Sequence, residues 1–167
     1  MDKLQAFFEN TKMLSDTLGI TPLLYGSLGL QYRTGKELNA DDIDILIPKE
    51  FLTEKWNEFH TVLAKDGYVL IDEHEHTFEK EGIYYSYAQL EELESFAGIS
   101  LGEMEIVEKG NIQFRVLSLL QYLKVYTASS KDGYRISTRN KKDFEKISLI
   151  QKQLSLLAKE SKDEPIV

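Results

Sequence analysis

Apolar residues follow helical spacing at both ends of this chain and strand-like runs between them. In the first twenty residues they recur every three or four positions, as on one face of a helix, at Leu4, Phe7, Phe8, Leu14 and Leu18. This pattern predicts an amphipathic helix that ends near Gly19, because glycine readily adopts the left-handed conformation that closes a helix.

The next segment predicts a short strand that leads directly into a short helix. We expect the strand over residues 22–25 and the helix over 28–33, with Gly35 at its end. Ser27 stands at the expected N-cap of that helix, where a serine hydroxyl accepts a hydrogen bond from an amide of the first turn. A second amphipathic helix is expected over 51–65, where apolar residues again recur at helical spacing.

The middle of the chain is rich in β-branched and aromatic residues, which are typical of strands. Turns that contain glycine separate these runs. The expected strands are an acidic strand that ends at Pro48 and residues 68–71, 83–88, 105–107 and 112–116.

The last third of the chain predicts two helices. Two pairs of residues have the spacing of helix N-terminal signals, namely Ser118 with Gln121 and Asn140 with Asp143. The first pair opens a helix expected over 119–127, and the second opens a longer helix that runs to about Lys159. Residues 161–167 are expected to fray.

These elements together predict an α+β fold, with a mixed β-sheet, flanking helices and a C-terminal helical segment. The chain has 167 residues, of which 42% are hydrophobic and 29% charged, which suits one soluble domain with a real core. We expect an α+β core over 1–117, helices packed on that core over 118–160, and a flexible tail over 161–167.

Charge and composition exclude several classes of function. The formal net charge of -8 argues against nucleic acid as a partner, because clustered Lys and Arg hold phosphate backbones. The absence of cysteine excludes disulfides, thiolate chemistry and cysteine-ligated zinc. The charged N-terminus lacks the apolar run of a signal peptide, and no segment is long enough for a membrane helix. We therefore expect a cytoplasmic protein with no membrane partner.

The acidic strand contains two aspartates, Asp42 and Asp44, that are two residues apart. Successive side chains of a strand point to opposite faces, so these carboxylates share one face while Ile43 and Ile45 share the other. Two neighbouring carboxylates repel each other and are costly to desolvate. The pair is most simply explained by a bound divalent cation.

Gly26 and Ser27 supply the second half of such a site. A glycine directly after a strand allows close backbone approach. The amides that open the following helix favour an anion such as a phosphate.

The order helix, strand, Gly26-Ser27, helix, and a strand with Asp42 and Asp44 resembles the nucleotidyltransferase superfamily with a DNA polymerase β-like palm. The length of the chain is similar to that of small bacterial members, the antibiotic-modifying and minimal nucleotidyltransferases. A weaker likeness to these members lies in residues 119–124 and 139–143.

The resemblance implies an enzyme that moves a nucleoside monophosphate from a nucleoside triphosphate to a hydroxyl of a small acceptor. It implies Mg²⁺ as cofactor, with Asp42 and Asp44 as catalytic metal ligands. Gly26 and Ser27 would bind the phosphates of the nucleotide. Aminoglycoside-like or lincosamide-like acceptors would fit the acidic balance of the chain.

Members of this superfamily use a third carboxylate, usually from the strand beside the one with the two aspartates. The expected neighbour at 83–88 contains no acid. Substitutes nearby are Glu79, Glu91, Glu92 and Glu94. Their flanking residues single out none of them, and Glu92 is named here as the catalytic candidate. Without a third acid, the chain would be a catalytically inactive module that binds a nucleotide or a partner protein.

For three other groups of residues an ordinary structural role is favoured over a functional one. His74 and His76 would share a strand face without a third ligand, so we expect surface residues. Tyrosines of a sheet usually fill the core rather than stack on a base, which applies to Tyr84, Tyr85 and Tyr87. Basic residues at helix surfaces are usually solvated, which applies to Lys124, Arg139, Lys141 and Lys142. The aromatic sheet or the C-terminal helix would allow a homodimer.

Overall fold

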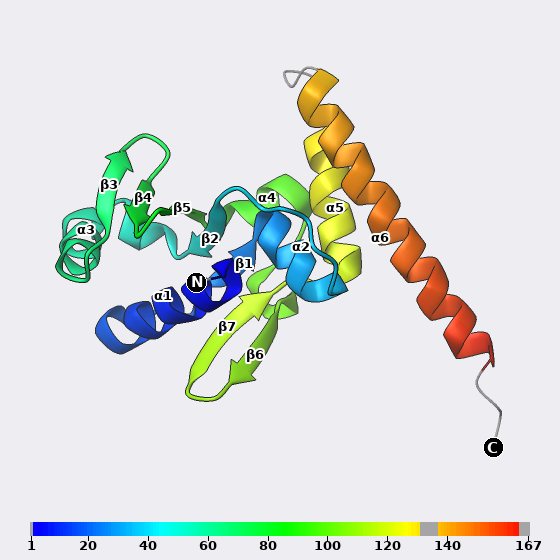
Figure 1. The fold of residues 1–167 in the computed structure, drawn as a ribbon, viewed down its shortest axis with the longest axis horizontal. Coiled ribbons are helices and arrows are strands. Elements are labelled where there is room, and N and C mark those ends of the chain that lie inside the picture. Colours follow the sequence, from blue (N-terminus) through cyan, green and yellow to red (C-terminus); the bar gives the residue numbers. More distant parts are fainter. Residues whose placement is uncertain (1, 131–136, 164–167) are drawn as a thin grey trace.

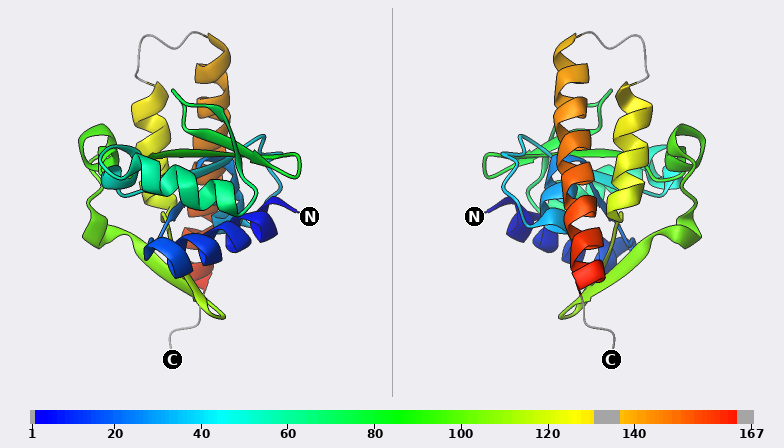
Figure 2. Two further views of the ribbon diagram at one scale, coloured as in Figure 1. Left: turned by 90° about the vertical axis from the view of Figure 1, so that its left-hand side faces the viewer. Right: turned by 90° about the vertical axis from the view of Figure 1, so that its right-hand side faces the viewer.

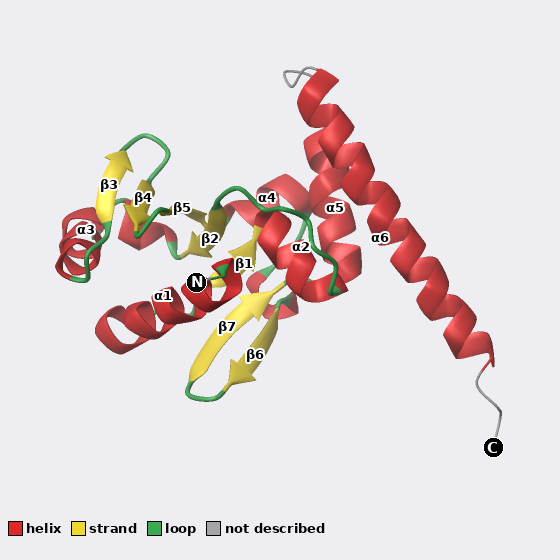
Figure 3. Cartoon of the chain, viewed as in Figure 1, coloured by secondary structure: helices red, strands yellow, loops and turns green. Residues whose placement is uncertain are grey.

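The computed structural model describes residues 2–130 and 137–163, and for 137–141 and 161–163 it describes the backbone alone. Within these residues the chain forms a seven-stranded mixed sheet with helices around it (Figure 1, Figure 3). The fold is therefore α+β, as expected. The strands are β1 (Leu23–Tyr25), β2 (Ile43–Ile47), β3 (Val69–Asp72), β4 (Thr77–Lys80), β5 (Ile83–Gln89), β6 (Glu105–Lys109) and β7 (Ile112–Val116).

The helices include two short 3₁₀ turns. They are α1 (Lys3–Leu18), α2 (Gly26–Thr34), η1 (Lys49–Leu52), α3 (Trp56–Lys65), α4 (Glu92–Ala97), η2 (Leu101–Glu103), α5 (Leu119–Ser130) and α6 (Ser137–Asp163). None of the helices described is both long and apolar enough to cross a lipid bilayer.

The strand order is β3-β4-β5-β2-β1-β7-β6. The central strand β2 runs antiparallel to β1 and parallel to β5. In this register Asp44 lies between Tyr25 on one neighbour and Ser86 on the other. Ile43 and Ile45 are fully buried, while both aspartates are half-buried. Asp42 lies in a bend directly before β2, outside the strand expected to contain it. The expected alternation therefore applies to Asp44, whose carboxylate is directed away from the core.

Several local signals act as expected. Gly19 ends α1 in the left-handed conformation, with φ of 66°. Ser118 and Gln121 form a reciprocal capping box at α5: the Ser118 amide donates to Gln121 Oε1 at 2.9 Å, and the Gln121 amide donates to Ser118 Oγ at 3.2 Å.

Two helix starts differ from expectation. Helix α2 begins at Gly26, so Ser27 lies inside its first turn, and Tyr25 takes the N-cap position without a side-chain hydrogen bond. The helix expected over 51–65 is divided, because a 3₁₀ turn precedes an α-helix that begins only at Trp56. Phe51 is buried in the 3₁₀ turn, and its position in the sequence happens to match the apolar spacing of the helix that follows.

Two further expectations are wrong. His74 and His76 lie in the turn between β3 and β4 rather than in a strand, and His76 has a positive φ of 52°. Helix α6 begins at Ser137 rather than at Asn140, so Asn140 is inside the helix. The side chains of Arg139 and Lys141 lie outside what is described. The helix continues to Asp163, past the expected fraying point, and 164–167 are outside the described residues.

Helices α5 and α6 pack against each other at one end of the sheet, as the two side views in Figure 2 show. The Ser129 hydroxyl of α5 donates to Asp143 Oδ2 of α6 at 2.8 Å, and both side chains are buried. Beyond α5, the C-terminal part of α6 extends away from the rest of the molecule (Figure 1). This pairing brings the first turns of α6 close to the start of α2.

Candidate active site

Asp44 of β2 and Asp42, which directly precedes this strand, lie beside the first turn of α2. Asp42, Asp44 and Ser27 line one pocket of about 730 Å³, together with Lys142 and Lys146 of α6. The structure therefore brings together four of the residues singled out from the sequence: Gly26, Ser27, Asp42 and Asp44.

Gly26 is in direct contact with the Asp44 carboxylate. Its φ is 62°, in the left-handed region that side chains other than glycine rarely adopt. A Cβ atom at this position would overlap the Asp44 carboxylate. Glycine is needed here for two independent reasons, the backbone conformation and the space that the carboxylate occupies.

The first turn of α2 provides an anion-binding geometry beside this carboxylate pair. The helix has nine residues, no acid in its first turn and no side-chain cap. Backbone amides in the first turn of a helix can donate to an anion, and the helix dipole favours negative charge there. Ser27 adds a hydroxyl at the wall of the pocket.

Asp42 is in an unfavourable electrostatic position. Partial burial and the neighbouring carboxylate of Asp41 raise its pKa above the ordinary value of 3.8, while Lys3 acts in the opposite direction. A bound cation would offset both unfavourable effects.

None of the four glutamates considered from the sequence lines a described pocket together with the aspartate pair. The described residues contain no group of three acidic, histidine or cysteine side chains that could hold a metal ion. Glu92 is exposed on α4 and lines none of the three pockets described around Asp44. Glu91 accepts a hydrogen bond from the Lys49 amide, and Glu79 accepts one from the Gly82 amide. The structure therefore does not bring Glu92 together with Asp42 and Asp44.

Hydroxyl groups occupy the position beside Asp44 instead. Ser86 of β5 pairs with Asp44 in the sheet, and Thr77 of β4 pairs with Ser86. The two hydroxyls are 2.9 Å apart and hydrogen-bonded. They line a second pocket with both aspartates, which also contains Asp72 and Glu75 from the β3–β4 turn region.

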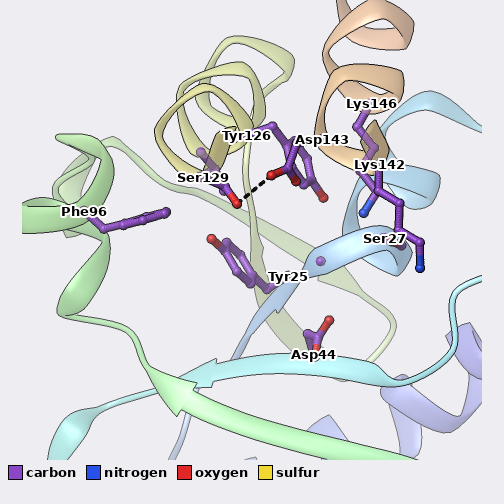
Figure 4. Close-up of a pocket in the computed structure, with 11 residues that line it drawn as sticks. Tyr25, Ser27, Asp44, Phe96, Tyr126, Ser129, Lys142, Asp143 and Lys146 are labelled. Atoms are coloured by element: carbon purple, nitrogen blue, oxygen red, sulfur yellow. Dashed lines mark hydrogen bonds between the residues drawn. The ribbon is translucent and has the colours of Figure 1, made fainter. Parts of the chain in front are cut away.

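A third pocket lies on the other side of Asp44, between β1, α4, α5 and α6 (Figure 4). It includes residues that the sequence did not single out as functional, namely Tyr25, Phe96, Tyr126, Ser129 and Lys146. Lys142, for which we expected a solvated role, is exposed but lines this pocket too. The four-residue spacing of Lys142 and Lys146 places both on one face of α6, and Lys142 also lies in the segment 139–143 that carries the weaker family likeness.

Comparison with known proteins finds a relative in sequence and several in fold. No protein-family model matches the chain. It is 40% identical over 146 residues to the uncharacterized protein YnaI of Bacillus subtilis strain 168, a match that covers 87% of this chain and 94% of that protein.

Three solved structures are similar in fold at low sequence identity. An antigenic nucleotidyltransferase-like protein from Paracoccidioides brasiliensis has a TM-score of 0.63 at 12% identity over 89% of this chain and 75% of its own. ANT(2")-Ia in complex with adenylyl-2"-tobramycin has a TM-score of 0.58 at 14% identity, covering 92% and 90%. The lincomycin-bound lincosamide adenylyltransferase LnuA has a TM-score of 0.54 at 16% identity, covering 90% and 98%.

Proposed function

We infer that this chain, which belongs to one family with Bacillus subtilis YnaI, is a member of the nucleotidyltransferase superfamily. We propose that it transfers a nucleoside monophosphate from a nucleoside triphosphate to a hydroxyl of a small acceptor. One observation carries the proposal. Asp42 and Asp44 line the same pocket as Ser27 in the first turn of α2, where Gly26 lies against the Asp44 carboxylate.

The donor set fits Mg²⁺, which would be held by Asp42 and Asp44. Mg²⁺ prefers oxygen ligands and commonly uses one or two carboxylates together with substrate phosphates and water. When bound, it supplies charge neutralisation of the triphosphate and lowers the pKa of an attacking hydroxyl.

The side chains and amides of this chain would position the nucleotide. The first amides of α2 and the Ser27 hydroxyl donate to phosphate oxygens, and Lys142 and Lys146 add positive charge from α6. The acceptor oxygen then forms a bond to the α-phosphorus, while the bond from that phosphorus to the bridging oxygen breaks and pyrophosphate leaves. The proton of the acceptor hydroxyl passes to water in the open pocket.

The acceptor we propose is a small cationic molecule such as an amino sugar. The pocket beside Ser86 contains the carboxylates of Asp72 and Glu75 in addition to the aspartate pair. These charges favour an amine-bearing acceptor, and the net charge of -8 disfavours a polyanion. The complexes with adenylyl-2"-tobramycin and with lincomycin are consistent with this class. We place the reaction in the cytoplasm.

The test is pyrophosphate release from each of the four nucleoside triphosphates with Mg²⁺ and a panel of aminoglycoside and lincosamide acceptors. Asp44→Asn is expected to abolish release without unfolding, because it removes one charge at little change in volume. Asp16→Asn removes a carboxylate that pairs with Lys12 on the surface of α1 and should retain full activity. Release that persists in Asp44→Asn would refute the proposal.

A second candidate is a catalytically inactive nucleotide-binding module. The observation that favours it is Ser86, a hydroxyl at the strand position beside Asp44. Such a module would be stabilised against heat by a nucleotide and Mg²⁺ together, yet would release no pyrophosphate with any acceptor of the panel.

A further inference from the structure

The pocket between β1, α4, α5 and α6, called here the tyrosine pocket, has a volume of about 410 Å³, within the range of small-molecule sites. One wall is Gly26, Ser27, Lys142 and Lys146, the groups proposed above to hold phosphates. Whatever enters it is therefore next to a bound triphosphate.

Tyr126 has a buried hydroxyl without a hydrogen-bond partner among the described residues. The residue is only 6% exposed, and in Figure 4 its oxygen points from α5 toward the space between Tyr25 and Ser27. Buried hydroxyls are nearly always paired, so an orphan at the wall of a pocket indicates a group that a ligand completes.

Tyr122, one turn earlier on α5, provides the contrast. Its ring stacks on that of Tyr126 at 6.3 Å between centroids. Its hydroxyl is also buried, but it donates to the Leu24 carbonyl at 2.9 Å. The two tyrosines share an environment and differ in whether the protein itself satisfies the hydroxyl.

The rest of the tyrosine pocket is divided into a polar and an apolar side. Ser129 and Asp143 are 7% and 4% exposed and form the polar side through their mutual hydrogen bond. On the apolar side, Phe96 is 44% exposed and reaches from α4 toward Tyr25 and Ser129 (Figure 4). A flat, partly apolar ligand with polar groups at its edge fits this division.

We propose that the tyrosine pocket receives the nucleoside portion of the nucleoside triphosphate and that Tyr126 is a specificity-determining residue whose hydroxyl bonds a polar group of that nucleoside. The inference rests on the proposed function. The acceptor is proposed to bind in the other pocket, beside Ser86, which is lined by Asp72 and Glu75 instead of by lysines. The nucleoside is covalently joined to the phosphates, so it must lie beside Gly26 and Ser27.

Two matched variants test this role, Tyr126→Phe and Tyr122→Phe. Affinity for each Mg²⁺-nucleoside triphosphate is measured by calorimetry, and stability by thermal unfolding without ligand. Tyr126→Phe is expected to lower affinity about fivefold to tenfold, the effect of losing one hydrogen bond, with an unchanged or higher unfolding temperature. Tyr122→Phe is expected to unfold at a lower temperature, because the buried Leu24 carbonyl loses its donor, and to keep wild-type affinity.

A third ligand shows which part of the nucleotide is recognised. Inorganic triphosphate with Mg²⁺ lacks the nucleoside, so its affinity should be equal in the wild type and Tyr126→Phe. Deoxynucleoside triphosphates separate the ribose from the base: a penalty that disappears with them assigns the bond to the 2′-hydroxyl, and a penalty that persists assigns it to another polar group of the nucleoside.

Three results would overturn the inference. The first is wild-type nucleotide affinity in Tyr126→Phe. The second is an equal loss of affinity for inorganic triphosphate. The third is the absence of Mg²⁺-dependent nucleotide binding by the wild type, which would remove the proposed function as well, whereas the first two leave it intact.

Discussion

Gly26 has no Cβ atom, and both its backbone conformation and the position of the Asp44 carboxylate require this. Gly35, at the other end of α2, has a similar φ of 73°, but a Cβ there would meet no atom within 4 Å. Gly35→Ala should lower the free energy of unfolding by about 1 kcal/mol, the cost of a left-handed alanine, and Gly26→Ala should lower it further, because its methyl group also overlaps the Asp44 carboxylate. Only Gly26→Ala should also lose pyrophosphate release, because its methyl group displaces the Asp44 carboxylate. Urea unfolding and turnover measure the two effects, and equal activity in both variants would contradict this expectation.

Asp42 should contribute unfavourably to stability near neutral pH. Its pKa is raised in the folded protein, so the folded state holds this proton more tightly than the unfolded state. Stability from this group is therefore present at low pH and decreases as the pH rises from about 3.8 through the folded pKa. Asp42→Asn should be at least as stable as the wild type at pH 7, while it loses Mg²⁺-dependent nucleotide binding.

Urea unfolding of Asp42→Asn and the wild type between pH 3 and 8 checks this sign. Asp16→Asn is the opposite control, because Asp16 pairs with Lys12 at the surface of α1 and its loss should cost about 0.3–0.5 kcal/mol. A clear loss of stability at pH 7 in Asp42→Asn would show that the carboxylate is favourably placed without any cation.

Among the helices and strands, features that depend on residues close in the sequence could be predicted. Features that depend on packing between elements far apart in the sequence could not. The capping box at Ser118 and Gln121 is local, and so is the alternation in β2 that separates Asp44 from the buried Ile43 and Ile45. Helix α6 begins before the predicted Asn140. Asn140 and Asp143 have the spacing of a helix N-terminal signal, yet the Asp143 carboxylate is buried against Ser129 of another helix.

The same distinction applies to the candidate site. Gly26 and the aspartates lie within twenty residues of one another, in a motif whose geometry follows from strand and helix periodicity. Tyr126, Phe96 and Lys146 reach the site only through the packing of α4, α5 and α6. The spacing of Lys142 and Lys146 predicts one shared helix face, but not the element that this face meets.

The hydrogen bond between Ser129 and Asp143 should hold α5 and α6 together. It is buried and involves a carboxylate, so Ser129→Ala should lower the free energy of unfolding by about 1.5–3 kcal/mol. Ser130→Ala is the neighbouring control, since that hydroxyl donates within its own helix to the Thr127 carbonyl and should cost about 0.5–1.5 kcal/mol. Urea unfolding measures both, and a similar loss in the two variants would show that the cross-helix bond adds nothing.

For the molecule as a whole, the site is assembled from three elements: the start of α2, strand β2 with the residue before it, and the first turns of α6, which is far away in the sequence. The first two contribute amides and negative charge, and α6 contributes Lys142 and Lys146 together with the carboxylate of Glu145. Because the whole chain carries a net charge of -8, a triphosphate meets an unfavourable field unless cations are concentrated where it binds. The position of α6 therefore decides whether this acidic protein can hold a polyanionic nucleotide.

The effect of an α6 lysine on nucleotide affinity should therefore depend on its location as well as on its charge. Lys142→Ala should lower the affinity for a Mg²⁺-nucleoside triphosphate about threefold to tenfold, as the loss of one charge-assisted contact would. Lys152→Ala removes the same charge from an exposed position farther along α6 and should change affinity by less than about twofold. Calorimetry at about 50 and 300 mM salt should show that the difference in affinity between the wild type and Lys142→Ala becomes smaller as the salt screens the charge. Equal losses in the two variants would mean that net charge, rather than the docking of α6 against the site, governs nucleotide binding.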